Sequence, residues 1–509
     1  PRRGAGSAYG AAPVSLSQLR AVSLALGVVL ALGCGSTQRL EPTAPGPEVL
    51  AATPKDPGAL AANAPERAPA PRERWAAPEP RHEKLADAVG LSVLRDPSAE
   101  LVELGFAFDA GSRRDGEHPG LAWLVAAELC ERLAGRVHRS GVRPRCSAAP
   151  EAIVLRLSAL PGDAPELTRA TLQAARTLTA LDERSLRARL SRADDDRLEP
   201  RVLAERLALR HLMVLTFAPH PAAWRFATDV QEGPFGTRAF QSFVERHLRR
   251  GGLEIVAVGP IDLEALRAAI DTRELAGRER ALLPAPGERE ERSARRKVVL
   301  IDRGRAADTS ITCSRLAHGA IETVELAAQV AALRAERALA AKGITARLRA
   351  RATDLGAFGV LVTLHTSTST ERAPTLASAL DESFELEAPP IAALAAEAHA
   401  RATDARRETW RSAAAAADAL LWATVRGGSL DAPLPDASDV VALGPSIEQA
   451  LDDARRSDGL VAIDGDAAVL AAPAAAALGV LDLLDPRRGM HRLRSVGPGT
   501  RSAPEEASP

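Results

Sequence analysis

The feature that most constrains the fold is a pattern of strand, glycine turn and amphipathic helix that occurs twice. The first copy, GLEIVAVGPIDLEALRAAID (252–271), has an apolar run that ends at a Gly-Pro turn and a helical period after it. The second copy, GLVAIDGDAAVLAAPAAAALG (459–479), repeats that order late in the chain. Two domains of one design are therefore predicted, and 509 residues are enough for both.

Strands and helices also alternate before each copy. The segment 100–111, ELVELGFAFDAG, alternates apolar and polar residues as a half-buried strand does, and a helical period covers 322–341. Short apolar runs predict further strands at 152–160, 297–302 and 357–366. This order predicts an α+β fold, two tandem homologous domains whose antiparallel-rich sheets carry packed helices. We place the domains at 81–275 and 297–485, with a charged linker at 276–296 between them and an unstructured tail at 486–509.

The N-terminal region is typical of an exported lipoprotein. Arg20 precedes an apolar run, 21–32, that has the length of the hydrophobic core of a signal peptide, is short for a membrane span and ends directly before Gly33-Cys34. The expectation is a signal peptide over 1–33, lipidation of Cys34, and a disordered Pro/Ala-rich spacer over 34–80. An ordinary cleaved signal peptide with an incidental cysteine is the alternative. Lipidation implies attachment to the cell envelope, with the periplasmic side of the outer membrane as the expected place.

Charge and cysteine content narrow the classes of function. The 65 basic and 66 acidic residues are spread along the chain, so no basic face suited to nucleic acid is expected. Besides Cys34 the chain has three cysteines, Cys130, Cys146 and Cys313. Cys130 and Cys146 could pair across a short helix-to-strand connection, and three buried thiols are the equal alternative. Cys-x-x-Cys and mixed Cys/His clusters are lacking, which argues against a zinc finger.

Several segments, in order, resemble the pitrilysin/insulinase/mitochondrial processing peptidase family of zinc peptidases. VELGFAFDAGSRRDGEHPGLAWLVAAEL (102–129) resembles the strand, the Ala-Gly-Ser-Arg turn and the helix that bears the family's metal motif. FAPHPAAWRF (217–226) resembles its His-Pro segment, and FQSFVERHLRRGGLEIVAVGPID (240–262) its closing helix, strand and turn. The resemblance covers about residues 84–485 and implies tandem metallohydrolase-like domains of the LuxS/processing-peptidase type.

The family's chemistry depends on His-x-x-Glu-His on that first helix, where two histidines hold zinc and the glutamate polarises the bound water. In the register set by Gly120-Leu121-Ala122, the two histidine positions hold Trp123 and Ala127, and the glutamate position holds Ala126. The family's downstream glutamate ligand should fall in a later helix, LDERSLRARLSRADDD (181–196), which has no glutamate after Glu183 and only Asp194–Asp196 at its end. The resemblance therefore predicts no catalytic residues and no cofactor here, with the zinc of active relatives lost.

The resemblance predicts two further losses. Active relatives supply an arginine and a tyrosine from the second domain to stabilise the oxyanion, and in AKGITARLRA (341–350) the tyrosine position is Ala346, with Leu339 or its neighbour at the arginine position. In addition, Pro144 lies in the segment 141–150 that corresponds to the substrate-binding edge, where it removes a backbone donor.

Three functions remain open at this stage. The first is a non-catalytic lipoprotein that pairs as a heterodimer with an active zinc peptidase homologue, as a structural or substrate-presenting partner. The second is a zinc metallopeptidase with a relocated site, and the third is a stand-alone peptide-binding protein.

Overall fold

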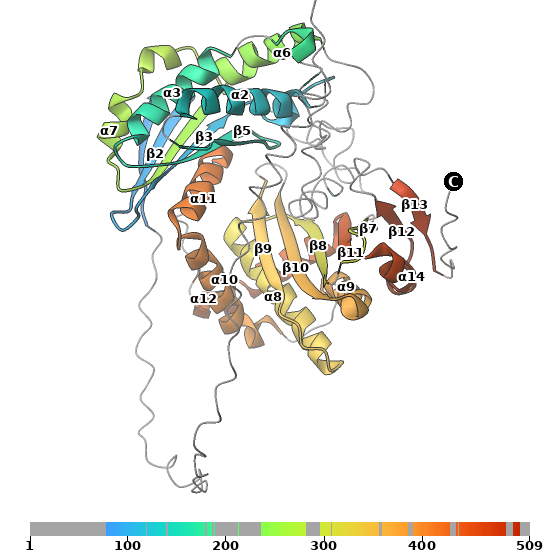
Figure 1. Ribbon diagram of the computed structural model, residues 1–509. Coiled ribbons are helices and arrows are strands. Elements are labelled where there is room, and N and C mark those ends of the chain that lie inside the picture. Colours follow the sequence, from blue (N-terminus) through green and yellow to red (C-terminus); the bar gives the residue numbers. More distant parts are fainter. Residues whose placement is uncertain are drawn as a thin grey trace, which may run out of the picture. The chain divides into compact units, whose positions relative to one another are not determined.

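The computed structural model describes two mixed sheets that carry packed helices, together with the connections between them (Figure 1). The described residues are 78–178, 236–280 and 296–498, apart from positions 119, 139–140, 307, 356–358, 385–389, 428–433, 436, 485–491, and, within 179–235, only 181–185, 188 and 212. Cys34, the expected leader, nearly all of the expected spacer and Asp194–Asp196 lie outside these residues. Among the described helices, none combines the length and the apolar character needed to cross a bilayer.

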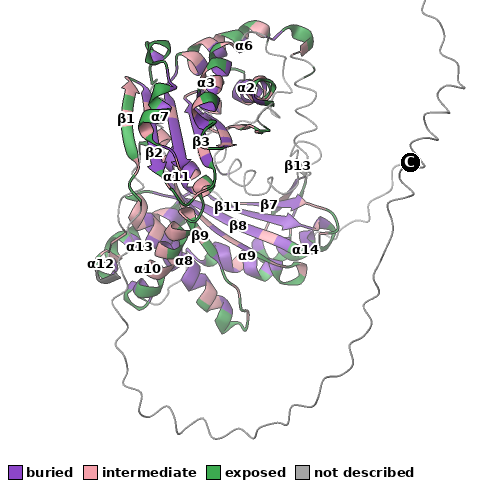
Figure 2. Ribbon diagram, turned by 60° about the vertical axis from the view of Figure 1, so that its left-hand side comes forward, coloured by how far each residue is buried: buried purple, intermediate pink, exposed green. Residues whose placement is uncertain are grey.

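The first sheet has six strands in the order β1-β2-β6-β3-β5-β4. Only β2 and β6 run parallel, and the other neighbours are antiparallel. The central strands are apolar on both faces, and Figure 2 shows them almost wholly buried, while β1 at the edge is largely exposed. The strands are β1 (Arg81–Ala86), β2 (Val89–Arg95), β3 (Val102–Phe108), β4 (Arg145–Ala148), β5 (Ile153–Ala159) and β6 (Leu253–Gly259).

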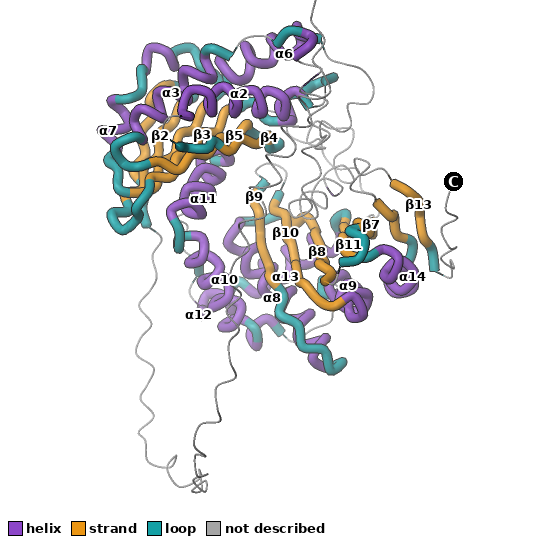
Figure 3. Tube along the Cα trace, in the orientation of Figure 1, coloured by secondary structure: helices purple, strands orange, loops and turns teal. Residues whose placement is uncertain are grey.

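One face of this sheet is covered by helices from its own half of the chain. Their apolar stripes form a single core with the inward residues of the strands, among them Phe106, Leu124 and Leu155. Figure 3 shows α2 and α3 side by side over this face. The elements are η1 (Ser112–Arg114), α2 (Leu121–Val137), α3 (Ala164–Arg176), α6 (Thr237–Phe243) with the π-helical turn η4 (Val244–Arg249), α7 (Leu263–Ala268) and η5 (Thr272–Leu275).

The second sheet has seven strands in the order β13-β12-β7-β11-β8-β10-β9. Strand β7 runs parallel to both β11 and β12, and the remaining pairs are antiparallel. The strands are β7 (Arg296–Asp302), β8 (Asp308–Ala317), β9 (Arg349–Asp354), β10 (Val360–Ser369), β11 (Gly459–Gly465), β12 (Leu481–Leu484) and β13 (Arg492–Val496).

The core of the second half centres on α8, whose long apolar face packs with the inward residues of the sheet. Both copies of the repeated unit, β6–α7 and β11–α14, have the predicted order of strand, turn and helix. The helices are α8 (Ile321–Ala341), η7 (Thr370–Arg372), α9 (Ala373–Glu382), η8 (Ile391–Ala393), α10 (Ala395–Thr409), α12 (Ala437–Ala442), α13 (Gly444–Arg456) and α14 (Ala467–Leu478). The predicted α+β class is confirmed.

A helix from the second half covers the other face of the first sheet. Helix α11 (Ala413–Arg426) packs its buried Ala417, Leu420 and Leu421 against β3 and β6 (Figure 3). Gly105 on β3 leaves room for this contact, because a Cβ there would lie 3.2 Å from a methyl carbon of Leu421. The outward apolar residues of the first sheet therefore have a cover that its own half does not supply.

One predicted boundary is wrong. Strand β13 lies within the segment 486–509 that the sequence assigns to an unstructured tail, and it pairs antiparallel with β12. Its sequence RLRSV carries two arginines, and charged residues are common on edge strands. The expected tail therefore begins after the last strand of the second sheet.

The packing of α11 predicts a large effect of a single truncation. Leu421→Ala should lower the free energy of unfolding by about 3 kcal/mol, because the buried side chain leaves a cavity between two rigid elements. Urea unfolding of a chain that begins at residue 75 measures this effect. The exposed Val441→Ala on α12 is the control and should cost less than about 0.5 kcal/mol. Equal effects of the two substitutions would contradict this placement of α11.

Candidate functional site

The turn that leads from β3 into α2 is built for close backbone contact. A Cβ on Gly111 would lie 2.3 Å from the carbonyl oxygen of Pro150, so only glycine fits against the β4–β5 turn there. The Ser112 and Arg113 N–H groups donate to the carbonyls of Ala149 and Pro150. This turn fixes the place where α2 begins.

A buried carboxylate holds the start of α2. Asp115 accepts the N–H of Gly120 at 2.6 Å and that of Ala122 at 2.8 Å, so it satisfies two donors of the first helical turn. Gly120 has φ 98°, a left-handed conformation that glycine adopts without strain. Burial raises the pKa of Asp115 to about 7, although the two backbone hydrogen bonds act in the opposite direction.

The residues at the family's ligand positions lie on α2 but carry no metal-binding atoms. Trp123 and Ala127 are partly exposed, and Ala126 is 2% exposed within the first core. Trp123 packs against that core at its margin. An indole and two methyl groups offer no lone pair suited to zinc, so these residues do not fit the zinc of active relatives.

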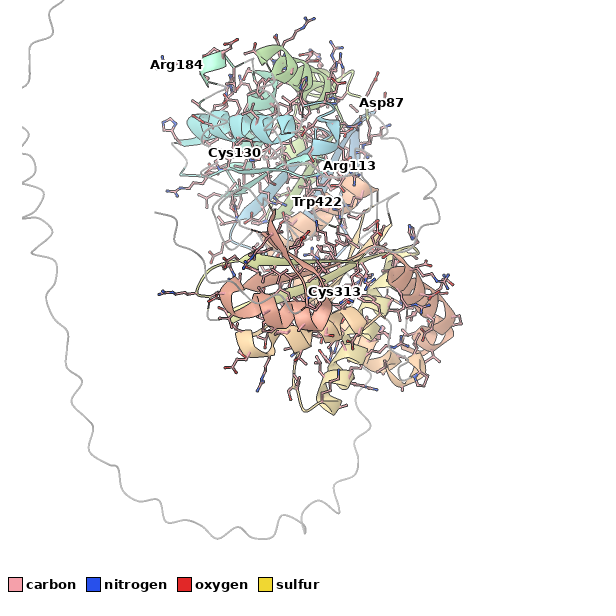
Figure 4. The ribbon with its side chains drawn as sticks, turned by 90° about the vertical axis from the view of Figure 1, so that its right-hand side faces the viewer. Asp87, Arg113, Cys130, Arg184, Cys313 and Trp422 are labelled. Atoms are coloured by element: carbon pink, nitrogen blue, oxygen red, sulfur yellow. A yellow bond between two sulfur atoms is a disulfide. The ribbon has the colours of Figure 1, made fainter. Side chains whose placement is uncertain are left out.

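Cys130 continues the same stripe of α2, since 123, 127 and 130 follow the spacing of one helical face. The structure joins it to Cys146 of β4 in a disulfide, with a Cα–Cα separation of 5.6 Å (Figure 4). The face on which the family's motif would lie is therefore linked covalently to the edge strand beside it.

Neighbouring polar groups on α2 make structural contacts. Glu128 is buried and accepts the Arg132 Nε–H at 3.1 Å, and Arg132 also donates to the carbonyl of Thr177 after α3. His118 precedes the helix and is exposed. Within the described ranges, no group of three or more His, Cys, Asp or Glu side chains could hold a metal ion.

A cluster of charged side chains connects the turn before α2 to α11. Glu151 Oε1 lies 3.7 Å from Arg113 Nη2 and 3.8 Å from Arg426 Nε, and all three side chains are largely buried. The Arg426 guanidinium also lies over the Trp422 ring, 4.8 Å from its centroid; Arg113 and Trp422 are labelled in Figure 4. Burial lowers the pKa of Arg113, and the nearby Glu151 opposes this shift. The cluster ties the two halves together beside the candidate site.

The two positions that correspond to the oxyanion donors of relatives hold apolar residues in this chain. Ala346 is partly buried against the second core, and Leu339 is fully buried on α8. Neither residue has a side-chain donor, so the structure places no hydroxyl or guanidinium at those two positions.

Two histidines and the third cysteine lie in packed surroundings on other elements. The His247 ring centroid lies 5.0 Å from that of Phe243, with the rings tilted by 58°, and burial lowers the pKa of His247. His365 on β10 lies 3.1 Å from Thr312 Oγ1. Cys313 is a free, fully buried thiol whose pKa burial raises to about 12. His220 lies outside the described residues.

Two residues of this region were missed by sequence reasoning. Asp115, five positions before the glycine that begins α2, is an acidic residue near a helix start and could have been found as a cap. Glu151 gave no signal, because its partner Arg426 is 275 residues away in the sequence.

Comparison with known proteins supports the fold and goes no further. Neither a protein family model nor a curated protein matches the sequence. Among solved structures, the chain is similar to a peptidase M16 inactive domain from Pseudomonas fluorescens, with 16% identity, a TM-score of 0.52 and coverage of 76% of this chain and 98% of that one. A chain of complex III2 from Candida albicans gives 13% identity and a TM-score of 0.53, covering 76% and 95% of the two chains.

Pitrilysin gives 13% identity and a TM-score of 0.54, and the match covers 77% of this chain but only 45% of the pitrilysin chain. The fold is therefore that of M16 peptidase domains, as the resemblance predicts.

The buried Asp115 predicts a pH dependence of stability. Its pKa of about 7 exceeds the ordinary 3.8, so between about pH 4 and 7 the folded protein holds a proton that the unfolded chain releases. The free energy of unfolding should therefore fall as pH rises through this window, by at most about 1.4 kcal/mol per pH unit. Chemical unfolding at several pH values should show this fall in the wild type and a flatter profile in Asp115→Asn. Exposed Asp404→Asn should keep the wild-type profile. A wild-type profile parallel to that of Asp115→Asn would contradict the prediction.

The cysteines predict a thiol count. In a chain that begins at residue 75, the folded protein should show no cysteine that reacts with a thiol reagent. The reason is that Cys130 and Cys146 are paired and Cys313 is fully buried. Denaturation without reductant should expose one thiol, and denaturation with reductant three. Peptide mass mapping should find Cys130 linked to Cys146. Three reactive thiols in the unreduced, denatured protein would contradict the pairing.

Proposed function

We propose that this chain, which has the fold of M16 peptidase domains, is a non-catalytic envelope lipoprotein that serves as a structural or substrate-presenting partner of an active zinc peptidase homologue. The proposal joins three parts: loss of peptidase chemistry, retention of the fold, and attachment through Cys34.

The observation that carries the proposal is the composition of one stripe of α2. The turn, the glycine and the helix occur in the family's order, so Trp123, Ala126 and Ala127 stand where the metal motif would be. Hydrolysis of a peptide by a zinc-bound water needs both a metal site and a base, and these side chains provide neither. The loss of both oxyanion donors, at Ala346 and Leu339, supports the same conclusion independently.

The comparisons support a role in an assembly. One similar structure is named an inactive M16 domain, and another belongs to complex III2. The fold thus occurs outside free-standing peptidases, and a chain without its own site can still present a surface to a homologue. The apolar leader ending at Gly33-Cys34 supports membrane attachment on the periplasmic side of the envelope.

Metal analysis and proteolysis assays test the loss of chemistry. Purified protein incubated with zinc and then dialysed should retain far less than one zinc per chain, and it should show no peptide cleavage that a chelator abolishes. The control is a homologue with an intact His-x-x-Glu-His motif, treated identically. Stoichiometric zinc together with chelator-sensitive cleavage would overturn the proposal and favour a relocated site.

Co-purification tests the partnership. The tagged full chain should recover from native membranes a homologue that bears His-x-x-Glu-His, and Cys34→Ser should release the tagged chain from the membrane fraction. Recovery of the tagged chain alone, at native expression levels, would contradict a stable pairing and favour a stand-alone binding protein.

A further inference from the structure

A row of arginines lies at the free edge of the second sheet. Strand β9 is the last strand of this sheet and pairs only with β10, beside which it lies in Figure 1. Arg349 and Arg351 are exposed on one face of β9, while Ala350 and Ala352, on the other face, pack against the second core. Arg347, two residues earlier, is exposed as well. The guanidiniums of Arg349 and Arg351 thus share the face of the sheet that is turned away from α8.

The neighbouring strands continue this face with hydroxyl and imidazole groups. Arg349 stands opposite His365 and Arg351 opposite Thr363 on β10. Across the next strand, Thr312 Oγ1 lies 3.1 Å from His365 Nδ1, and Ser314 Oγ lies 3.4 Å from Thr363 Oγ1. These side chains form a polar grid of β9 and β10, defined here as Arg347, Arg349, Arg351, Thr363, His365 and the exposed Ser367.

The positive charge of this grid is not neutralised. Within the part of the chain that the structure describes, no ion pair joins Arg347, Arg349 or Arg351 to a carboxylate, although many other arginines are paired, such as Arg401 with Glu336 and Arg406 with Glu325. Carboxylates on the same face lie on the inner strands β8 and β11. Asp308 of β8 stands opposite Ser369, and Asp464 of β11 is paired with Arg303.

Protection of a sheet edge does not require these arginines. Charged residues often prevent an edge strand from recruiting another strand. Side chains of α8 already bond two backbone groups at this edge. The N–H of Leu348, just before β9, donates to Glu336 Oε1 at 2.7 Å, and Gln329 Nε2 donates to the Ala350 carbonyl of β9 at 3.3 Å. A ligand of the arginines would therefore lie across the face of β9 and β10 and would not extend the sheet.

The spacing of the row indicates what it can bind. Alternate residues of a strand are about 6.7 Å apart, and so are alternate side chains of any extended polypeptide. Carboxylates on every second residue of such a chain could each meet one guanidinium in a charge-assisted hydrogen bond. The hydroxyls and the imidazole of β10 could bond the backbone between them.

We propose that the polar grid of β9 and β10 binds an extended acidic polypeptide with carboxylates on alternate residues. The inference deepens the proposed substrate-presenting role by naming the class of polypeptide that is bound. Only the biological purpose of this binding rests on the proposed role. Its test measures binding without any peptidase, so a failure would leave the loss of catalysis and the pairing with a homologue standing.

The experiment uses the full protein and a fluorescein-labelled peptide of alternating Glu and Thr, with binding followed by fluorescence anisotropy at low and physiological salt. The expected result is saturable binding that weakens with salt. Arg349→Glu/Arg351→Glu should weaken the binding at least tenfold, because attraction between the charges becomes repulsion. Arg349→Lys/Arg351→Lys keeps the positive charge and should retain most of the wild-type affinity. The control is Arg250→Glu/Arg411→Glu, which reverses two exposed charges outside the grid, each paired with a carboxylate, and should change affinity less than twofold.

Competitors decide the class of ligand. A peptide of the same composition with its glutamates in blocks should compete several-fold less well than the alternating peptide, and a lysine–threonine peptide should not compete. Three results would overturn the proposal: no binding at low salt, equal weakening by the two charge-reversal variants while both keep the wild-type melting temperature, or equal competition by single-stranded DNA or dextran sulfate at the same charge concentration. The last result would assign the grid to polyanions in general.

Discussion

The structure depends on the packing of α11 against the first sheet. A sheet with apolar side chains on both faces needs a cover on each. Helices α2 and α3 cover one face, and Leu420 and Leu421 of α11, from the other half of the chain, cover the second. The Arg113–Glu151–Arg426 cluster closes the end of this contact, where removal of one partner would leave buried charge behind. Among the described residues the cover of this second face comes from the other half, so the halves are expected to fold interdependently.

The contacts that hold α2 in place are separate from the positions at which the family's metal motif would lie. The start of α2 is fixed by the Asp115 carboxylate, its middle by Leu124 and Leu129 in the core, and its outer stripe by the link from Cys130 to β4. None of these contacts uses a residue at the family's motif positions. Trp123, Ala126 and Ala127 carry no metal-binding atoms, and the contacts above hold the helix without them. The fold of M16 peptidase domains is therefore physically compatible with these side chains.

The sequence predicted the parts of the structure whose signal is local. Strand β3, the long helix α8 and the two strand–turn–helix units follow from apolar periodicity, and the register of α2 follows from Gly120. Strands β1, β2, β8, β9, β12 and β13 were not identified from the sequence. For β1, β9 and β13 the reason is that RHEKLA, RARATD and RLRSV are edge strands rich in charge, with few apolar residues to alternate. Strands β2, β8 and β12 are largely buried, and their apolar residues were not assigned to strands. The periodicity of α11 predicts a helix but does not say which sheet it covers. For the same reason the sequence could locate the ligand positions on α2, yet it could not show that Glu151 lies between two arginines.

The arginines of β9 become distinctive only when the strand order and register of the sheet are known. In sequence, RLRAR differs little from many other arginine-rich stretches of this chain, most of which pair with nearby carboxylates. Only the strand register places Arg349 and Arg351 beside His365 and Thr363 and away from Asp308 and Asp464. An unpaired charge at a surface costs little in water, so stability alone neither requires nor forbids this arrangement. What distinguishes it is geometry: guanidiniums at the repeat of an extended chain, on a face whose edge is already closed by Gln329 and Glu336. A surface of that kind selects ligands by the spacing of their charges, and such selection requires no cleavage.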